Sequence, residues 1–281
     1  MGNIGENRYS FDEMNHIHQL DGLPLYGTTT VLSVLSKPLT WWAAGLAVKE
    51  LSGIDDPSIF TRIKNKKASK SDLEQLTLKV TEWLIDHQNI TPLEYIQLLD
   101  KAYRAHSVKL ETTAQAGIDL HAELERFVKD QIIGIKGIGY DPKIAPFVMW
   151  CEENVKRFLW SEGYCYSEKH WLGGISDVGC ELNDGMLMIG DFKSSKAVYT
   201  SHILQAGAYD ICISENGILD KWGNLVYKPE KPFGGYFVIP FGAPIVEPHY
   251  HTEFDVTTQE CQEAFINALS LYKILQKMEQ K

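Results

Sequence analysis

Several features that define whole classes of protein are missing from this 281-residue chain. It has no apolar run of roughly 18 residues, the length from which a helix can span a bilayer, so we expect no contact with a membrane. The first residues, Met1 to Arg8, contain no apolar stretch of the kind that marks a secretory signal. We therefore expect a cytoplasmic protein.

The chain also lacks closely spaced cysteines. The nearest two of its five cysteines, Cys151 and Cys165, are 14 positions apart, and no CxxC pair occurs. This spacing argues against a zinc knuckle and against a thioredoxin-type redox motif. We expect reduced and mostly buried thiols.

Positive charge is scarce as well, with 27 Lys and Arg against 37 Asp and Glu and a formal charge of −10. This balance argues against a protein that coats nucleic acid, because phosphate binding normally needs a basic surface. It does not exclude an enzyme with a local basic groove, and acidic metal ligands would themselves lower the net charge. With 44% hydrophobic residues, the chain can form an ordinary globular core.

The first part of the chain is mainly helical by pattern, and neither repeats nor low-complexity tracts occur in the sequence. Residues 1–28 look irregular, a short helix is expected from Val31 until Pro38 interrupts it, and Ser71 is the expected cap of a later helix. The further helices are expected at 40–50, 71–86, 92–106, 111–130 and 144–160.

The pattern then changes to strands, and the combination predicts an α/β protein. Strands are expected at 164–172, 174–182, 186–193, 235–240 and near 244–250, with helices at 200–213 and 257–278. We expect a helical N-terminal portion, residues 1–110, packed on a core formed by residues 111–281, the whole forming one compact unit.

The turn Asn183-Asp184-Gly185 separates two of these strands. A three-residue loop with glycine in the left-handed position is a common hairpin connection. In that register Asp177 lies opposite Asp191, with Cβ atoms about 5 Å apart. A loop of another length shifts the partner by one residue, so the sequence leaves other registers open.

Two ionised carboxylates this close repel each other, and a divalent cation would relieve the repulsion. Oxygen ligands suit Mg²⁺ or Mn²⁺. Lys193 follows Asp191 by two positions on the same strand face. Its ammonium can there orient a metal-bound water and stabilise charge that develops on a phosphate. The alternative is a simple Asp/Lys ion pair at the end of a strand.

The helix expected after this hairpin carries His202, Gln205 and Tyr209 on one stripe. Polar groups on the inner side of an otherwise apolar helix need partners. An active site at the end of the strand 186–193 would provide them.

These elements together resemble the PD-(D/E)XK nuclease superfamily, and in particular its RecB-type, phage-type exonuclease branch. The resemblance covers residues 117–209 and implies a restriction-endonuclease-like core with a central mixed β-sheet flanked by helices. The matching motifs, in chain order, are Gly117-Ile-Asp-Leu-His121, Gly174-Ile-Ser-Asp177, Ile189-Gly-Asp191-Phe-Lys193-Ser194 and Gln205-x-x-x-Tyr209.

The resemblance implies a role for each matching residue. Asp177 and Asp191 would bind Mg²⁺ or Mn²⁺, together with the imidazole of His121 and the backbone carbonyl of Phe192. Lys193 would position the attacking water. The four flanking cysteines of the family's iron–sulphur members are not matched, so no iron–sulphur cluster is expected.

Two further residues of the motifs, Gln205 and Tyr209, would order the site and contact the substrate phosphate. Glu168, nine positions before Asp177, is a candidate ligand for a second metal or a neighbour of the first. The alternative for Glu168 is a solvated residue on a strand.

Other side chains are weaker candidates for substrate contacts. Aromatic rings can stack on unpaired bases, and the basic run 62–70 can hold a phosphate backbone, although core packing and simple exposure are the alternatives. These candidates are Trp41, Trp42, Lys66, Lys67, Ser194, Lys196 and His202.

The expected function is metal-dependent hydrolysis of phosphodiester bonds in DNA by a metal-activated water, from the end of a single or double strand. Family members imply a role in phage recombination or DNA repair, in a bacterium or a phage-infected host cell, with a homo-oligomer or a recombination protein as a possible partner. The alternatives are a restriction-like endonuclease and a catalytically inactive DNA-binding subunit on the same fold.

Overall fold

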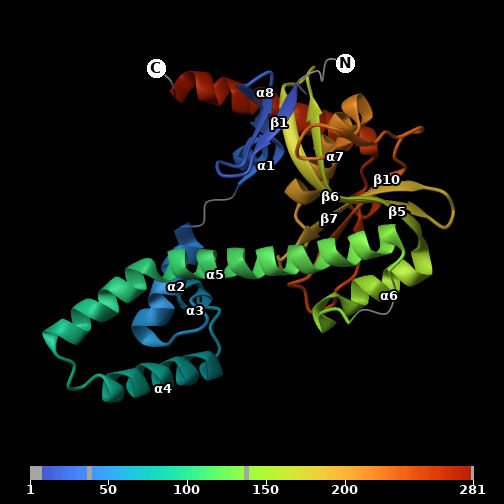
Figure 1. Ribbon diagram of the computed structural model, residues 1–281. Helices are drawn as coiled ribbons and strands as arrows, with labels where there is room; N and C mark the ends of the chain where they lie inside the picture. The colour runs from blue at the N-terminus through green and yellow to red at the C-terminus, as the bar shows by residue number, and fades with distance from the viewer. Residues whose placement is uncertain (1–7, 37–39, 136–138, 280–281) are drawn as a thin grey trace. The chain divides into compact units, whose positions relative to one another are not determined.

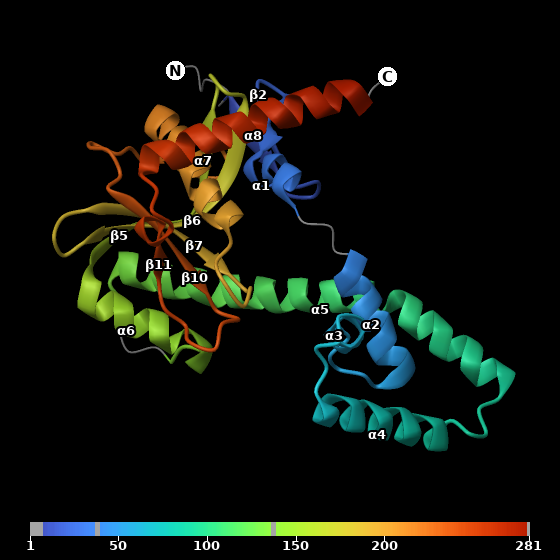
Figure 2. The same ribbon diagram turned by 180° about the vertical axis from the view of Figure 1, so that it is seen from behind.

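The computed structural model describes residues 8–36, 40–135 and 139–279. The chain divides into two compact units, shown in Figures 1 and 2. Unit 1 comprises the described residues of Met1–Ser36 and Gly117–Lys281, and unit 2 those of Lys37–Ala116. The expected boundary at residue 110 therefore differs from the observed division, and the residues before Ser36 group with the C-terminal part of the chain. Among the described residues, no helix is both long and apolar enough to cross a membrane.

Unit 1 is built on a mixed sheet of eight strands, as the α/β prediction requires. Its order is β11-β10-β7-β6-β5-β8-β9, and β4 also pairs with β6. The pairs β7–β10 and β4–β6 are parallel, and the other pairs are antiparallel. The strands are β4 (Tyr26–Gly27), β5 (Val155–Ser167), β6 (Leu172–Leu182), β7 (Leu187–Lys193), β8 (Ile218–Leu219), β9 (Leu225–Tyr227), β10 (Gly235–Pro240) and β11 (His249–Tyr250).

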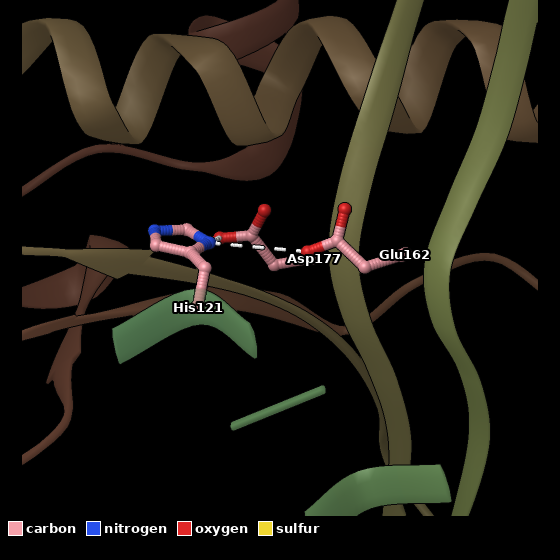
Figure 3. A group of neighbouring side chains, drawn as sticks. All are labelled: His121, Glu162 and Asp177. Atoms are coloured by element: carbon pink, nitrogen blue, oxygen red, sulfur yellow. Dashed lines mark ion pairs between the residues drawn. The ribbon is translucent and has the colours of Figure 1, made fainter. Parts of the chain in front are cut away.

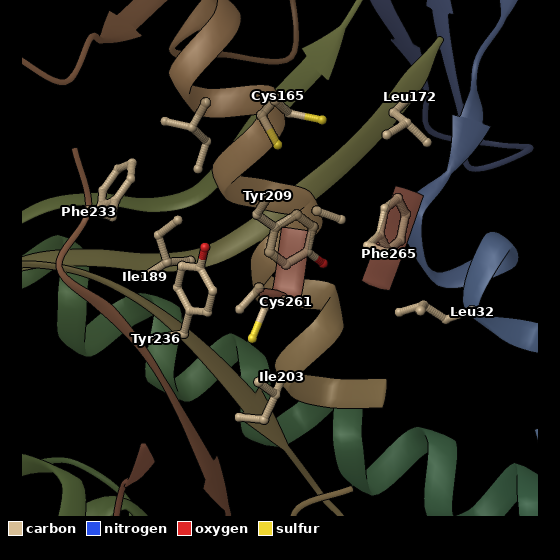
Figure 4. Packing of buried hydrophobic residues seen from close by; sticks show 14 of the residues in the cluster. Leu32, Cys165, Leu172, Ile189, Ile203, Tyr209, Phe233, Tyr236, Cys261 and Phe265 are labelled. Carbon is tan, nitrogen blue, oxygen red and sulfur yellow. The ribbon is translucent and has the colours of Figure 1, made fainter. Parts of the chain in front are cut away.

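Helices flank this sheet and bury both of its faces. Because side chains alternate between the two faces of a strand, Ile189 of β7 points into a core with α7 (Thr200–Asn216) and α8 (Thr258–Glu279). Figure 4 shows this core around Tyr209 and Phe265. Met188 and Phe192 point into a second core. This core contains Leu124, Phe127 and Val128 of α5 (Pro92–Ile133) and Phe147 and Cys151 of α6 (Ala145–Asn154). Burial on both faces explains the continuous apolar run of β7.

A second, three-stranded sheet corrects the expectation that residues 1–28 are irregular. Tyr9 and Leu20 of this sheet are buried in a small core with Leu219. The elements here are β1 (Tyr9–Asp12), β2 (Ile17–Leu20) and β3 (Leu23–Pro24), followed after β4 by α1 (Thr28–Val31) and the 3-10 turn η1 (Leu32–Leu35). Strands this short leave only a weak alternation in the sequence.

The expected helix at 144–160 is wrong beyond Asn154, where β5 begins. The sequence from Val155 to Trp160 is rich in β-branched and aromatic residues, which suit a pleated, half-buried surface. Two register shifts interrupt the pairing of β5 with β6, between Val155 and Arg157 and between Phe158 and Trp160. These bulges disturb the two-residue period by which the strand would have been recognised.

Unit 2 consists of helices, as expected. Its elements are α2 (Thr40–Ser52), α3 (Ser58–Lys64), α4 (Lys70–Asp86) and the N-terminal part of α5. The cap of α4 is Ser69 rather than Ser71, and it forms a capping box with Asp72. The helices expected at 92–106 and 111–130 are one helix, since no glycine or proline separates them.

Three short 3-10 segments complete the description: η1, η2 (Pro142–Ile144) before α6, and η3 (His251–Phe254) before α8. The strand expected near 244–250 is reduced to the two residues of β11. The remaining predictions of strands at 174–182, 186–193 and 235–240 and of helices at 200–213 and 257–278 are confirmed within a few residues.

Candidate metal centre

The hairpin of β6 and β7 has the register that the sequence predicts. The ladder runs from Glu181 opposite Leu187 to Val178 opposite Gly190, and Gly185 in the loop has a φ of +87°. Asp177 and Asp191 are the next positions beyond the last pair of this ladder. The two aspartates therefore sit side by side where β6 and β7 stop pairing.

The Asp177 carboxylate occupies the gap that opens between the two strands. Its Oδ2 accepts a hydrogen bond of 2.6 Å from the backbone N–H of Phe192. This contact replaces a missing ladder bond and fixes the orientation of the carboxylate. The Phe192 ring is buried in the core, and its carbonyl as a metal ligand stays a prediction.

Lys193 is bound to Asp191 rather than free. Its Nζ donates a 2.9 Å hydrogen bond to Oδ1 of Asp191 and lies 2.7 Å from Oδ2. Asp191 is fully buried. The contact of its Oδ2 with the Lys193 ammonium offsets part of the cost of burying the charge.

His121 of α5 and Glu162 of β5 complete a cluster with Asp177, drawn in Figure 3. The Nδ1 atom of His121 lies 3.8 Å from Oδ2 of Asp177 and 3.9 Å from Oε1 of Glu162. One ligand atom from each of the three side chains lies within 4.8 Å of the other two. A single cation between these atoms would contact all three residues.

Glu162 was not among the residues expected from the sequence. It lies between two ladder pairs, Ser161 with Val178 and Gly163 with Ser176, so it faces Asp177 across β5 and β6. Its φ of +49° is in the left-handed region, which a glutamate rarely adopts. Strained residues of this kind gather at functional sites. No pattern in the sequence points to Glu162, because its place opposite Asp177 depends on the pairing of β5 with β6.

The structure does not bring Glu168 into this cluster. Its carboxylate accepts two hydrogen bonds from Arg8, at 2.9 and 3.0 Å, and is half exposed. Arg8 also binds Asp21, so the three side chains form a surface network. Within the described residues, the acid beside His121 and Asp177 is Glu162 and not Glu168.

Burial and mutual charge shape the protonation of this centre. Burial raises the pKa of Asp191 to about 6, against the opposing effect of Lys193. Burial also raises the pKa of Asp177. Burial alone would lower the pKa of His121, but the carboxylates of Glu162 and Asp177 outweigh it and raise that pKa to about 9. Negative charge is thus concentrated here beyond what Lys193 alone neutralises.

On α7, Gln205 and Tyr209 bind each other as the motif suggests. Gln205 Nε2 donates to the Tyr209 hydroxyl at 2.5 Å and to Thr29 Oγ1 at 3.2 Å. Tyr209 is buried and packs against β6 at Gly174. These contacts join α7, α1 and the sheet, which supports an ordering role. Contact of either side chain with a phosphate stays a prediction.

His202, Ser194 and Lys196 lie near the C-terminal end of β7. The Nδ1 atom of His202 accepts the Tyr199 backbone N–H at 3.2 Å. Burial, together with the charge of Lys193, lowers the pKa of His202 to about 4, so its imidazole is neutral. Ser194 is exposed and lies close to Gly117, where an added Cβ would be 3.4 Å from its Oγ. Lys196 is exposed.

Four of the expected substrate contacts belong to unit 2. Trp42, Lys66 and Lys67 are exposed. Trp41 is part of α2, but its side chain lies outside the described residues. Their role in binding substrate stays a prediction.

The residues of unit 1 fit a divalent cation. The donor set contains one imidazole and carboxylates, which suits Mn²⁺ and Mg²⁺. Three of the ligand atoms already lie within reach of one ion.

Comparisons with known proteins identify no relative of this chain. No family model matches it, and no curated protein matches it.

Proposed function

We propose that this protein is a Mg²⁺- or Mn²⁺-dependent deoxyribonuclease with a restriction-endonuclease-like core of the PD-(D/E)XK, RecB-like type, acting as an exonuclease in the cytoplasm. The observation that carries the proposal is the meeting of Asp177, Asp191 and Lys193 where β6 and β7 separate. His121 and Glu162 add two donors from other elements.

The four side chains His121, Glu162, Asp177 and Asp191 would hold the cation. When bound, a divalent cation makes a water more acidic and offsets charge on a phosphodiester. The Lys193 ammonium, fixed by Asp191, donates hydrogen bonds toward the attacking water and the phosphate oxygens. Burial excludes bulk water around Asp191, which strengthens these charge interactions.

The direct test is digestion of end-labelled linear DNA, single- and double-stranded, with Mg²⁺, with Mn²⁺ and with excess EDTA. Cleavage should need the metal and should fall by about 10³-fold in Asp191→Asn, since a preorganised charge is lost at the reacting phosphate. Asp210→Asn is the matched control, because Asp210 is also buried in unit 1 but binds Tyr236 and Gln262 instead. Full activity in EDTA or in Asp191→Asn would refute the proposal.

A second substrate distinguishes an exonuclease from an endonuclease. We expect linear duplex to be degraded progressively, while covalently closed circular duplex survives the same conditions. Conversion of the closed circle into discrete fragments would replace the exonuclease assignment with the restriction-like one. Binding of linear DNA without any cleavage would favour the inactive DNA-binding subunit.

A further inference from the structure

Charge is distributed unevenly between the two units. Residues 37–116 contain 11 Lys and Arg and 10 Asp and Glu, whereas the rest of the chain contains 16 and 27. Unit 1 therefore carries all of the protein's excess negative charge, with a formal charge of −11 against +1 for residues 37–116. A polyphosphate would be repelled by unit 1 except at its cation, so any extended backbone contact needs a positive surface elsewhere.

Most basic side chains of unit 2 are already neutralised by an acid. The ion pairs are Lys49 and Lys79 with Asp55, Arg62 with Asp56 and Asp72, Lys70 with Glu74, Lys101 with Glu50, and Arg104 with Asp100. Among the described residues of this unit, the basic side chains in no such pair and in no hydrogen bond are Lys64, Lys66, Lys67 and Lys109. Three of these four therefore lie within four consecutive positions, and all three are exposed.

Lys64 is the last residue of α3, and the loop after it, which carries Lys66 and Lys67, is held in a fixed shape. The backbone N–H of Lys67 donates to the carbonyl of Arg62 at 2.8 Å, and that of Lys66 donates to Ile63 at 3.0 Å. This pair of bonds is the Schellman arrangement that ends a helix, here α3. The Arg62 side chain binds Asp56 and Asp72, which ties the loop to the start of α4.

Lys66 occupies the position of this arrangement at which glycine is usual. Its φ is +55°, a conformation that costs an ordinary residue about 1 kcal/mol or more. A lysine here adds a third exposed ammonium within four positions of the chain, at the expense of backbone strain. That combination favours a ligand with several closely spaced negative charges.

We propose that Lys64, Lys66 and Lys67, the lysine loop, bind the phosphodiester backbone of DNA. This inference rests on the proposed function for the identity of the ligand. Lysine contacts phosphate as a compact point charge and reads no base, so the lysine loop holds substrate of any sequence. Each phosphate that it contacts releases condensed counterions.

Binding of short labelled duplex and single-stranded DNA by fluorescence anisotropy, in EDTA and over a range of salt, tests this directly. The triple variant Lys64→Gln/Lys66→Gln/Lys67→Gln should bind at least about tenfold more weakly at low salt. The slope of log K against log salt should flatten by about 2 to 3 for duplex. The matched control, Lys101→Gln/Arg104→Gln/Lys109→Gln, removes equal charge from α5 and should change both values much less. Equal effects in the two triple variants would overturn the proposal.

A single substitution separates binding from folding. Lys66→Gly relieves the left-handed strain, so the melting temperature should hold or rise, while DNA binding should weaken two- to tenfold. Unchanged binding in Lys66→Gly and in the triple variant would contradict the lysine loop. Because these measurements need no cleavage, their failure is distinguishable from failure of the nuclease assignment, which is judged by digestion.

Discussion

The two units of this protein differ in what they bury. Unit 1 has an apolar core on each face of its sheet. In unit 2 the only buried apolar side chains among the described residues are Ile54, Ile59 and Ala102. All ionisable side chains that are buried in the described part of the chain also lie in unit 1. A densely packed sheet can hold charged groups in costly surroundings, whereas a helical unit with little core keeps its charges at the surface.

This contrast predicts that truncating an apolar side chain lowers the free energy of unfolding more in unit 1 than in unit 2. Ile189→Ala should lower the free energy of unfolding by about 2 to 5 kcal/mol, because Ile189 is fully buried between β7 and the α7–α8 layer. Leu84→Ala on α4 should change it by less than about 0.5 kcal/mol, since Leu84 is 58% exposed. Denaturant unfolding of both variants measures the difference. A similar loss in each would show that α4 packs against apolar surface in solution.

The next largest effect concerns Lys193, whose ammonium pairs with the buried carboxylate of Asp191. Lys193→Met should reduce the cleavage rate by about 10²-fold, because a preorganised hydrogen-bond donor is lost at the reacting phosphate. Binding of Mn²⁺, measured by calorimetry, should persist, since Lys193 is no ligand. Normal cleavage by this variant would remove Lys193 from the mechanism. Lys277→Met, on an exposed lysine of α8, is the control.

A buried histidine makes unit 1 sensitive to acid. Burial lowers the pKa of His18 from 6.5 to about 4, so the unfolded chain takes up a proton before the folded one does. The contribution of His18 to the free energy of unfolding is fully present above pH 6.5, the pKa of the unfolded state. It is lost as the pH falls toward about 4, the pKa in the folded protein. Between about pH 7 and about pH 5 this linkage should cost roughly 2 kcal/mol.

The measurement is the pH dependence of the free energy of unfolding in the wild type and in His18→Asn. The variant has no imidazole to titrate, while its amide can still form a hydrogen bond with the Tyr9 hydroxyl that binds His18 Nδ1 at 2.6 Å. We expect a flatter acid limb in His18→Asn. Identical slopes in the two proteins would contradict a role for His18.

The smallest expected effect distinguishes Glu162 of β5 from Glu168, which directly follows that strand, as the metal ligand. Glu162→Gln should weaken Mn²⁺ binding by about tenfold, because one charged donor of the cluster is removed. Glu168→Gln should leave it unchanged, since Glu168 pairs with Arg8 at the surface. Calorimetry on the metal-free variants gives both values. Weaker Mn²⁺ binding in Glu168→Gln and unchanged binding in Glu162→Gln would instead make Glu168 the ligand, the glutamate named from the sequence.

Local patterns were enough for much of unit 1. The loop Asn183-Asp184-Gly185 and the two-residue period of the flanking strands predicted the register that places Asp177 beside Asp191. Helical spacing predicted that Gln205 and Tyr209 share one side of α7, where they bind each other. These features depend on residues close in the chain, so the sequence alone expresses them.

The rest depended on contacts between distant segments. Whether Glu162 or Glu168 approaches His121 is decided by the pairing of β5 with β6, which places Glu162 opposite Asp177 and ends at Ser167, before Glu168. The short strands β1, β2 and β3 form because they pair with one another, and β4 forms because it pairs with β6. Their own propensity does not account for them. The unpaired state of the lysine loop likewise appears only once the neighbouring ion pairs are known.

The α/β class, the β6–β7 hairpin and the order of the acidic and basic groups along it could be predicted from the sequence, because turn chemistry and strand periodicity act over a few residues. The third acid beside His121 and Asp177, the depth at which Asp191 is buried and the lysines without an acidic partner could be identified only in the folded chain. Those properties follow from long-range packing, in which a shift of one residue in a single ladder changes the side chains that meet.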